Sequence, residues 1–155
     1  MTTHQLMEQE NELVLERFNH QDALEMGLGI IALAQEDDVN VAIHIEKNRV
    51  PLFTHLMEGT TEENHYWLYR KKRVVDHYQK SSAFIEARFK EADATHDEHS
   101  LLAPERYQAV GGSIPIRVEG VGMVGTVTVA GLTGELDHRY AVRGIKRFLA
   151  RKTTK

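Results

Sequence analysis

Apolar residues recur every three to four positions in the first part of the chain, which is the spacing of amphipathic helices. A first helix is expected from about Gln5 to Phe18. A stronger helix follows Asn19, which suits a helix N-cap and has Asp22 three residues later. Glycines within this second helix lower its helix propensity, which indicates close packing against a neighbour. The residues expected on its packed face are Leu24, Gly27, Leu28, Ile31 and Ala34.

At Val41 the period of the apolar positions changes from helical to two, which predicts a strand. Asn48 and Arg49 then make a tight connection to a second strand, Val50 to Leu56. Pro51 cannot donate a ladder hydrogen bond, so its position favours a sheet edge or the start of a strand. The two faces of the first strand are expected to be Val41, Ile43 and Ile45 on one side and Ala42, His44 and Glu46 on the other.

The middle of the chain is predicted to be helical. Thr60 and Glu63 have the spacing of a capping box and open a long polar helix that contains Trp67. The serines Ser81 and Ser82 are expected to break or kink it, and a further helix is expected from about residue 83 to 92. The segment from 94 to 107 has no clear period and is expected to be an exposed loop with a short turn or helix.

The last third of the chain predicts a second hairpin and a final helix. The strands are expected at about 112–118 and 123–130, and Thr133 caps the helix that follows. The apolar stripe of this helix contains Ala141, Ile145, Phe148 and Leu149. Two hairpins with helices at both chain ends predict an antiparallel sheet covered by helices, in an α/β (α+β) fold without βαβ crossovers.

Length and composition narrow the class of protein. The 155 residues suit one domain, spanning 1–155, with a single core. The net charge of -4 gives no basic field for nucleic acid. The chain has no cysteine, which excludes disulfides, thiolate metal sites and a thiol nucleophile. A polar N-terminus and the absence of a long apolar run predict a cytoplasmic protein with no membrane partner.

Several short motifs in the chain have simpler structural explanations. Gly120, Gly122 and Gly125 match G-x-G-x-x-G, but a strand follows them where a dinucleotide site needs a helix, so a hairpin turn is expected. His96 and His99 form the closest histidine pair, yet they fall in the expected surface loop, and no metal site is predicted. His44 is expected to be an exposed or edge histidine. No serine has a hydrolase motif around it.

Candidate ligand contacts gather around the start of the last helix. Asp137 and His138 follow the Gly131 loop, where backbone N–H groups and a titratable ring can face a bound anion. The alternative is that Asp137 caps the helix and His138 lies at the surface. In the basic run of residues 70–73, most side chains are expected in solvent, although Arg70 or Lys71 can turn inward to hold a carboxylate or phosphate.

Two long blocks of the chain resemble a known family. The block PLFTHLMEGTTEENHYWLYRKKRVVDHYQKSS, at 51–82, is similar to the pattern "LF...L.GT...N..W..RK...V..F..SS" of the HbpS-like, haem-degrading-domain family (GlcG/PduO C-terminal-like), in its uncharacterised small-protein branch. The block AVGGSIPIRVEGVGMVGTVTVAGLTGELDH, at 109–138, resembles "GG.FPI......VGTVTVSGL...DH" of the same family. The resemblance implies a profilin-like three-layer α/β/α fold and assembly into homo-oligomers.

The chain departs from the family pattern at Ile114, Ala130 and Arg49, where Phe, Ser and a hairpin Gly are common. A positive φ is costly for an arginine at the last of these positions. Haem binding belongs to some relatives, and no motif here selects an iron ligand. The sequence therefore predicts an oligomeric small-ligand-binding module of unassigned activity, with a haem-binding or haem-degrading protein and a scaffold without ligand as alternatives. The predicted ligand contacts are Gly111, Gly112, Gly131, Asp137, His138 and Arg70.

Overall fold

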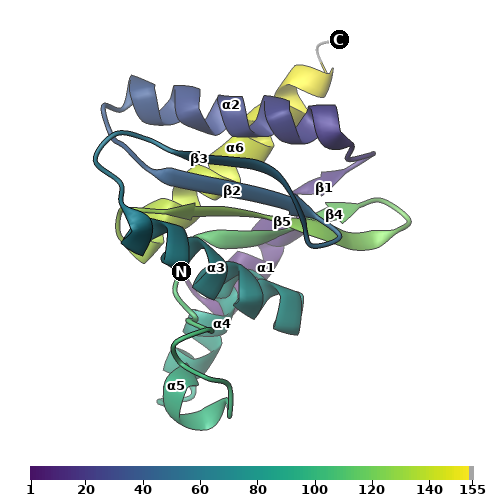
Figure 1. Ribbon diagram of the computed structural model, residues 1–155. Helices are drawn as coiled ribbons and strands as arrows, with labels where there is room; N and C mark the ends of the chain where they lie inside the picture. The colour runs from purple at the N-terminus through teal and green to yellow at the C-terminus, as the bar shows by residue number, and fades with distance from the viewer. Residues whose placement is uncertain (154–155) are drawn as a thin grey trace.

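The computed structural model describes residues 1–153, which form a five-stranded mixed sheet with helices on both faces (Figure 1). The strand order is β1-β4-β5-β2-β3, and all neighbours are antiparallel except β1 and β4. The elements, in chain order, are α1 (Thr3–Asn11), β1 (Val14–Leu15), α2 (His20–Glu36), β2 (Ala42–Lys47), β3 (Val50–Leu56), α3 (Glu62–Tyr78), α4 (Ser82–Glu91), α5 (His96–His99), β4 (Ser113–Val118), β5 (Gly122–Ala130) and α6 (Gly134–Thr153).

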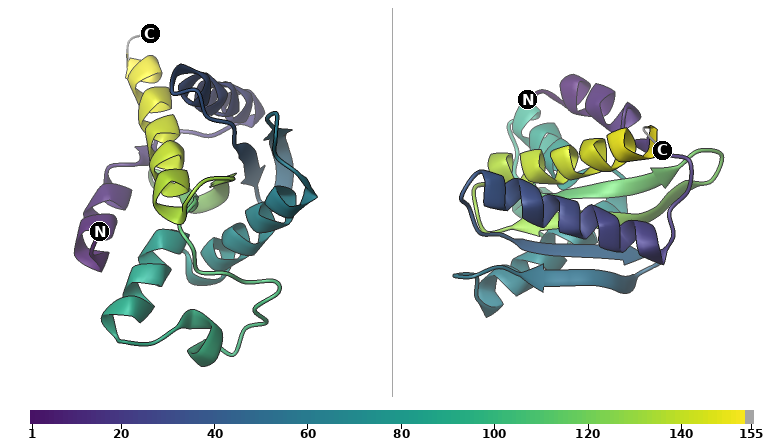
Figure 2. Two further views of the ribbon diagram at one scale, coloured as in Figure 1. Left: turned by 90° about the vertical axis from the view of Figure 1, so that its left-hand side faces the viewer. Right: turned by 90° about the horizontal axis from the view of Figure 1, so that it is seen from above.

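The sheet lies between two helical layers, as the resemblance implied (Figure 2). Helices α2 and α6 pack on each other and on one face of the sheet, and α3 packs on the other face. Helix α1 packs against α4 on the α3 side. The largest apolar cluster fills the space under α2 and α6, and it includes Ile30, Ile43, Ile45, Val127 and Ile145. Within residues 1–153, no helix combines the length and the apolar character needed to cross a membrane.

The prediction of a first helix reaching Phe18 was wrong. Helix α1 ends at Asn11, and Val14–Leu15 continues as strand β1, parallel to β4. The extended backbone buries Leu13 and Leu15 in the main core, where each is no more than 2% exposed. This burial outweighs the weak helical spacing of the segment. The parallel pair also makes the sheet mixed, where the sequence predicted an antiparallel one.

Helix α2 begins as predicted but presents a different face to the core. The Asn19 side chain accepts from the Asp22 N–H at 2.8 Å, and the Asp22 carboxylate accepts from the Asn19 N–H at 3.0 Å. Leu24 and Leu28 are 41% and 52% exposed, contrary to expectation. The packed face is rotated by about one position, and it consists of Ala23, Met26, Gly27, Ile30, Leu33 and Ala34.

The first hairpin is confirmed, but the environment of its first strand differs from the prediction. Asn48 and Arg49 form the turn with φ of 51° and 65°, and β3 is an edge strand. Strand β2 lies between β3 and β5, and helices α2 and α3 contact it from the two sides of the sheet. His44 is therefore fully buried, and the prediction of an exposed or edge histidine was wrong.

The ends of α3 follow the predicted signals with a shift of one residue at the start. The helix begins after Thr61, whose N–H donates to the Asn64 side chain at 2.9 Å, and not after Thr60. It ends at Tyr78, and the Ser81 hydroxyl accepts from the Phe84 N–H at 3.1 Å to start α4. The predicted break at the two serines is confirmed.

The two weak motifs have structural roles in the fold. Gly120 and Gly122 have φ of 75° and 103° in the β4–β5 turn, which confirms the hairpin interpretation. His96 is only 6% exposed and contacts the Tyr78 hydroxyl at 3.1 Å, so the prediction of a surface residue was wrong for His96, whereas His99 is exposed. Over the described residues, no group of three or more His, Asp or Glu side chains is placed to hold a metal ion.

Candidate functional site

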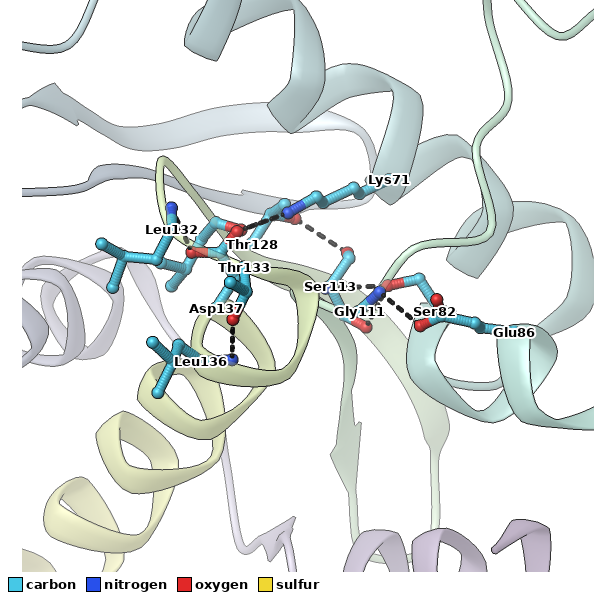
Figure 3. A network of polar contacts seen from close by, with 11 residues as sticks. Lys71, Ser82, Glu86, Gly111, Ser113, Thr128, Leu132, Thr133, Leu136 and Asp137 are labelled. Carbon is cyan, nitrogen blue, oxygen red and sulfur yellow. Dashed lines mark hydrogen bonds and ion pairs between the residues drawn. The ribbon is translucent and has the colours of Figure 1, made fainter. Parts of the chain in front are cut away.

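A buried polar network joins the start of α6 to α3 (Figure 3). The Asp137 carboxylate accepts from the Leu132 N–H at 3.0 Å, which ties the Gly131 loop to the helix. Its other oxygen accepts from the Lys71 ammonium at 2.8 Å. Lys71 also donates to the Val129 carbonyl at 3.2 Å. Asp137 thus ties the loop to the helix and pairs with a cation from another helix as well.

The Lys71–Asp137 ion pair is almost completely removed from water. The two side chains are 3% and 1% exposed. Burial lowers the pKa of Lys71 and raises that of Asp137, and their mutual attraction opposes both shifts. In each group the net shift is toward the neutral form, so the cost of desolvation exceeds the Coulombic gain of the pair.

Of the two cations proposed to turn inward, the structure selects Lys71. The guanidinium of Arg70 lies at the outer side of α3, where its Nε donates to the Glu105 carbonyl at 3.1 Å. It also lies over the Trp67 ring, 5.2 Å from the ring centre. Arg70 points about 100° away from Lys71 around the helix axis, and this rotation takes its guanidinium away from the sheet. Arg70 is therefore separate from the other predicted contacts.

Gly111 and Gly112 let the chain pass between Lys71 and the first turn of α6. A Cβ on Gly112, whose φ is 141°, would lie 2.4 Å from the Val129 carbonyl oxygen and 2.8 Å from the Lys71 nitrogen. A Cβ on Gly111 would lie 2.5 Å from the Gly134 carbonyl oxygen. Both positions therefore exclude any side chain, and they bring the β4 entry into contact with α6.

His138 points to the opposite side of this glycine segment. Its ring is 6% exposed, and Nε2 lies 2.7 Å from the Gln9 side-chain oxygen of α1. Nδ1 is buried and has no hydrogen-bond partner among the described residues. Burial lowers the pKa of His138 to about 4, so the ring is neutral at pH 7. The predicted contacts other than Arg70 therefore converge at the start of α6, and His138 is not a surface residue.

Two cavities flank this convergence, and Val110 and Gly134 line both. The smaller one, about 250 Å³, lies over Lys71, Asp137 and Gly131. The larger one, about 680 Å³, lies between α1, α4 and α6 and contains His138. We call it the His138 cavity. Its apolar lining includes Leu6, Ala83, Ala87, Val110 and Val142, and its charged lining is Glu86, Lys90, Glu135, Arg139, Arg143 and Lys146.

A second buried network was missed from the sequence. The His44 nitrogens lie 2.6 Å from the Thr54 hydroxyl and 2.6 Å from the Glu46 carboxylate. Lys72 donates to Glu46 at 2.8 Å and to Asp76 at 2.6 Å. Burial raises the pKa of Glu46, but hydrogen bonds from His44 and Lys72 outweigh it and hold that pKa below its usual value. The sequence does carry a sign of this network. Lys72 and Asp76 have the i, i+4 spacing of a helical ion pair, and His44 and Glu46 share one face of a strand.

The comparisons with known proteins agree with one another. A family model described as "Haem degrading protein HbpS-like" matches residues 18–146. The UPF0303 protein SCO2848 of Streptomyces coelicolor is 41% identical over 148 residues, covering 96% of this chain and 94% of its own. A UPF0303 protein of Serratia proteamaculans is 34% identical over 144 residues, covering 93% of this chain and 89% of its own.

Solved structures give the same result for the fold. The Ybr137w protein is similar with a TM-score of 0.88 and 28% identity, covering 96% of this chain and 88% of its own. HbpS has a TM-score of 0.68 at 18% identity, covering 86% of this chain and 90% of its own. A structure titled as a PduOC:Heme complex has a TM-score of 0.71 at 16% identity, covering 83% of this chain and 93% of its own. At such low identity, the last two support the fold alone.

Proposed function

The chain belongs to the HbpS-like family, and from that premise we propose that it is a small-ligand-binding module whose ligand occupies the His138 cavity. The observation that carries the proposal is a cavity of about 680 Å³ with an apolar lining and a buried neutral histidine in its wall. Ligand pockets in proteins commonly enclose about 300–1,000 Å³ and combine apolar walls with a few polar groups. No reaction is assigned to the module.

The lining favours a ligand with an apolar body and an anionic end. Four basic side chains and two acidic ones line the cavity, which leaves a formal excess of two positive charges. Arg143 is engaged by Asp37 at 2.8 Å and Arg139 by Glu135 at 3.5 Å. Lys90 forms no ion pair within residues 1–153, so it is available to an anion. A carboxylate or sulfonate at the rim would pair with these groups while its apolar part displaced water from the walls.

His138 gives the cavity a polar group with an unmet hydrogen bond. With Nε2 donating to the Gln9 oxygen, Nδ1 carries a lone pair without a partner. A buried acceptor without a donor costs about 1–3 kcal/mol, which a ligand donor would recover after a small rotation of the ring. This group would select ligands that carry a hydroxyl or an N–H beside their apolar body.

Haem is the alternative that the family description raises, and the arrangement of donors does not fit it. The basic rim suits two carboxylates, but an iron atom needs an axial ligand such as a histidine nitrogen. His138 is the histidine that lines the cavity within residues 1–153, and in its present orientation Nε2 is bonded to Gln9 and Nδ1 is buried. Without a rotation of its ring, this histidine is not placed to ligate a haem iron.

The module is proposed to work as a homo-oligomer. Leu24 and Leu28 lie one turn apart on α2 and expose 41% and 52% of their surface. A second copy of the chain would cover this apolar pair and remove it from water. A scaffold that acts only through such an interface is the remaining alternative, and it requires no ligand in the cavity.

The test uses an amphipathic anion, anilinonaphthalene sulfonate, together with native mass spectrometry. We expect the folded protein to bind the dye saturably, and Lys90→Gln and Arg139→Gln each to weaken binding severalfold. Arg147→Gln, on the same helix as Arg139, is the matched control. Arg147 pairs with Glu36 outside the cavity, so this variant should bind the dye like the wild type.

Two results would contradict the proposal. An oligomer that binds no dye while its circular dichroism remains native would leave the scaffold as the better explanation. A stoichiometric Soret band on haem addition that His138→Ala removes would favour haem in its place.

A further inference from the structure

A separate basic hollow lies away from the His138 cavity. It forms where the β2–β3 turn and the C-terminal half of α3 (Figure 1) meet the loop around residue 106. Its volume is about 180 Å³. The charged side chains that line it are Arg49, Lys72, Arg73, Asp76 and Arg106. Two of them belong to the basic run on α3 that the His138 cavity does not use.

The positive charge of the hollow is not balanced within the chain. Asp76 is its single carboxylate, and it is engaged by Lys72 at 2.6 Å. Lys72 in turn holds the buried Glu46 at 2.8 Å. Among the residues that the structure describes, none of the three arginines forms an ion pair with a carboxylate. Three arginines therefore line one hollow without a carboxylate partner of their own, which is an electrostatic cost that a bound anion would relieve.

The chain holds one of these guanidinium groups in a fixed orientation. Arg73 donates through Nη1 to the Arg106 carbonyl at 3.2 Å, so α3 and the loop are joined at the hollow. Burial and the nearby charge of Arg106 lower the pKa of Arg73, as expected for a partly buried cation beside another cation. Preorganised donors of this kind lose less freedom when they bind an anion.

Arg49 reaches the hollow from a backbone conformation that disfavours it. It is the second residue of the two-residue β2–β3 turn, and its φ of 65° lies in the left-handed region. Turns of this type prefer Asn or Gly at such positions, because they adopt positive φ at low cost. Arg49 is exposed, so no burial of its side chain compensates for the conformation. A function of its guanidinium explains why an arginine stands there.

We propose that this hollow binds a phosphate group, either free or as the head of a phosphomonoester. Arginine forks match the geometry of phosphate oxygens, and a phosphomonoester carries about −1.5 to −2 charges at pH 7. A volume of about 180 Å³ equals the share of roughly six water molecules at about 30 Å³ each. It accommodates one phosphate with a few waters, so the rest of an ester would extend into solvent.

Isothermal titration with inorganic phosphate and with methyl phosphate, at ionic strength fixed with chloride, tests the proposal. We expect saturable binding with a dissociation constant of about 1 mM or lower. Arg73→Gln and Arg106→Gln should each weaken it about tenfold, as the loss of a charge-assisted hydrogen bond implies. Lys80→Gln is the matched control, because it removes the same unit of charge just beyond the C-terminal end of α3, at a residue that does not line the hollow.

Arg49→Asn separates a binding role from a structural one. Asparagine tolerates the positive φ. In phosphate-free buffer the variant should therefore have a higher melting temperature than the wild type. Its phosphate affinity should nevertheless fall about tenfold. The proposal is overturned if phosphate does not bind by about 10 mM, if acetate binds as tightly as phosphate, or if Lys80→Gln weakens binding as much as Arg73→Gln.

Discussion

Removing the ammonium of Lys71 should destabilise the protein severely. Lys71→Met leaves the Asp137 carboxylate, 1% exposed, with the Leu132 N–H as its remaining donor among the described contacts. Breaking a buried ion pair by deleting one partner costs about 3–5 kcal/mol. Native domains are stable by about 5–15 kcal/mol, so the variant loses a large part of its total. Arg70→Met, at the preceding position of the same helix but facing outward, loses only a hydrogen bond to the Glu105 carbonyl and a contact with the Trp67 ring, so it should cost no more than about 1–2 kcal/mol.

The double variant Lys71→Met/Asp137→Leu should recover most of that loss. The shifts of both pKa values toward the neutral forms indicate that desolvation exceeds the attraction within the pair. Replacing such a pair by apolar side chains of similar volume is commonly neutral or stabilising. The Leu132 N–H loses its acceptor, which costs about 1–3 kcal/mol, so the double variant should lie within about 2 kcal/mol of the wild type.

The single variant also has a defined pH dependence. The pKa of Asp137 is higher in the folded protein than in the unfolded chain. Protonated Asp137 therefore stabilises the fold at pH values below the unfolded-state pKa, and this stabilisation is lost as the pH rises through the folded-state pKa. Without Lys71 that folded pKa rises further. The deficit of Lys71→Met relative to the wild type should therefore shrink as pH falls from 7 toward about 4.

Urea unfolding followed by circular dichroism, at several pH values in this range, measures these differences. The reasoning is refuted if Lys71→Met lies within about 1 kcal/mol of the wild type at pH 7. It is also refuted if the loss of unfolding free energy in the double variant equals the sum of the losses in Lys71→Met and Asp137→Leu, because such additivity would mean that the two residues do not interact.

Two further predictions concern single positions. Burial lowers the pKa of His138 from 6.5 to about 4 in the folded protein. The neutral ring therefore contributes fully to the free energy of unfolding above pH 6.5, and this free energy falls by about 3 kcal/mol as the pH drops to 4. Urea midpoints of the wild type should show this slope, and a His138→Gln profile of equal slope would contradict it. Gly27→Ala should lower the melting temperature, because the new Cβ would lie 2.4 Å from the Phe53 ring. Gly29→Ala on the same helix meets open space and should raise the melting temperature. Equal shifts of the two melting temperatures would contradict the packing argument.

The candidate site was only partly predictable from the sequence. Asp137 and His138 were found because a glycine loop followed by a capped helix is a local pattern. Lys71 remained one of two alternatives, since the rotation of α3 about its axis depends on the sheet it packs against. Lys72 and Glu46 were missed because they are 26 positions apart in the chain and meet only when α3 covers β2.

The sequence by itself determined the features that depend on neighbouring residues. The Asn19 cap, the turn at Asn48–Arg49, the break at Ser81–Ser82 and the β4–β5 hairpin follow from local backbone preferences and side-chain hydrogen bonds. Tertiary structure decided the rest. Strand β1 exists because β4 supplies its partner, and His44 is buried because β2 is central. Lys71 reaches Asp137 because α3 packs over the end of β5, after which α6 begins. These features depend on contacts between distant segments, and no local pattern specifies such contacts.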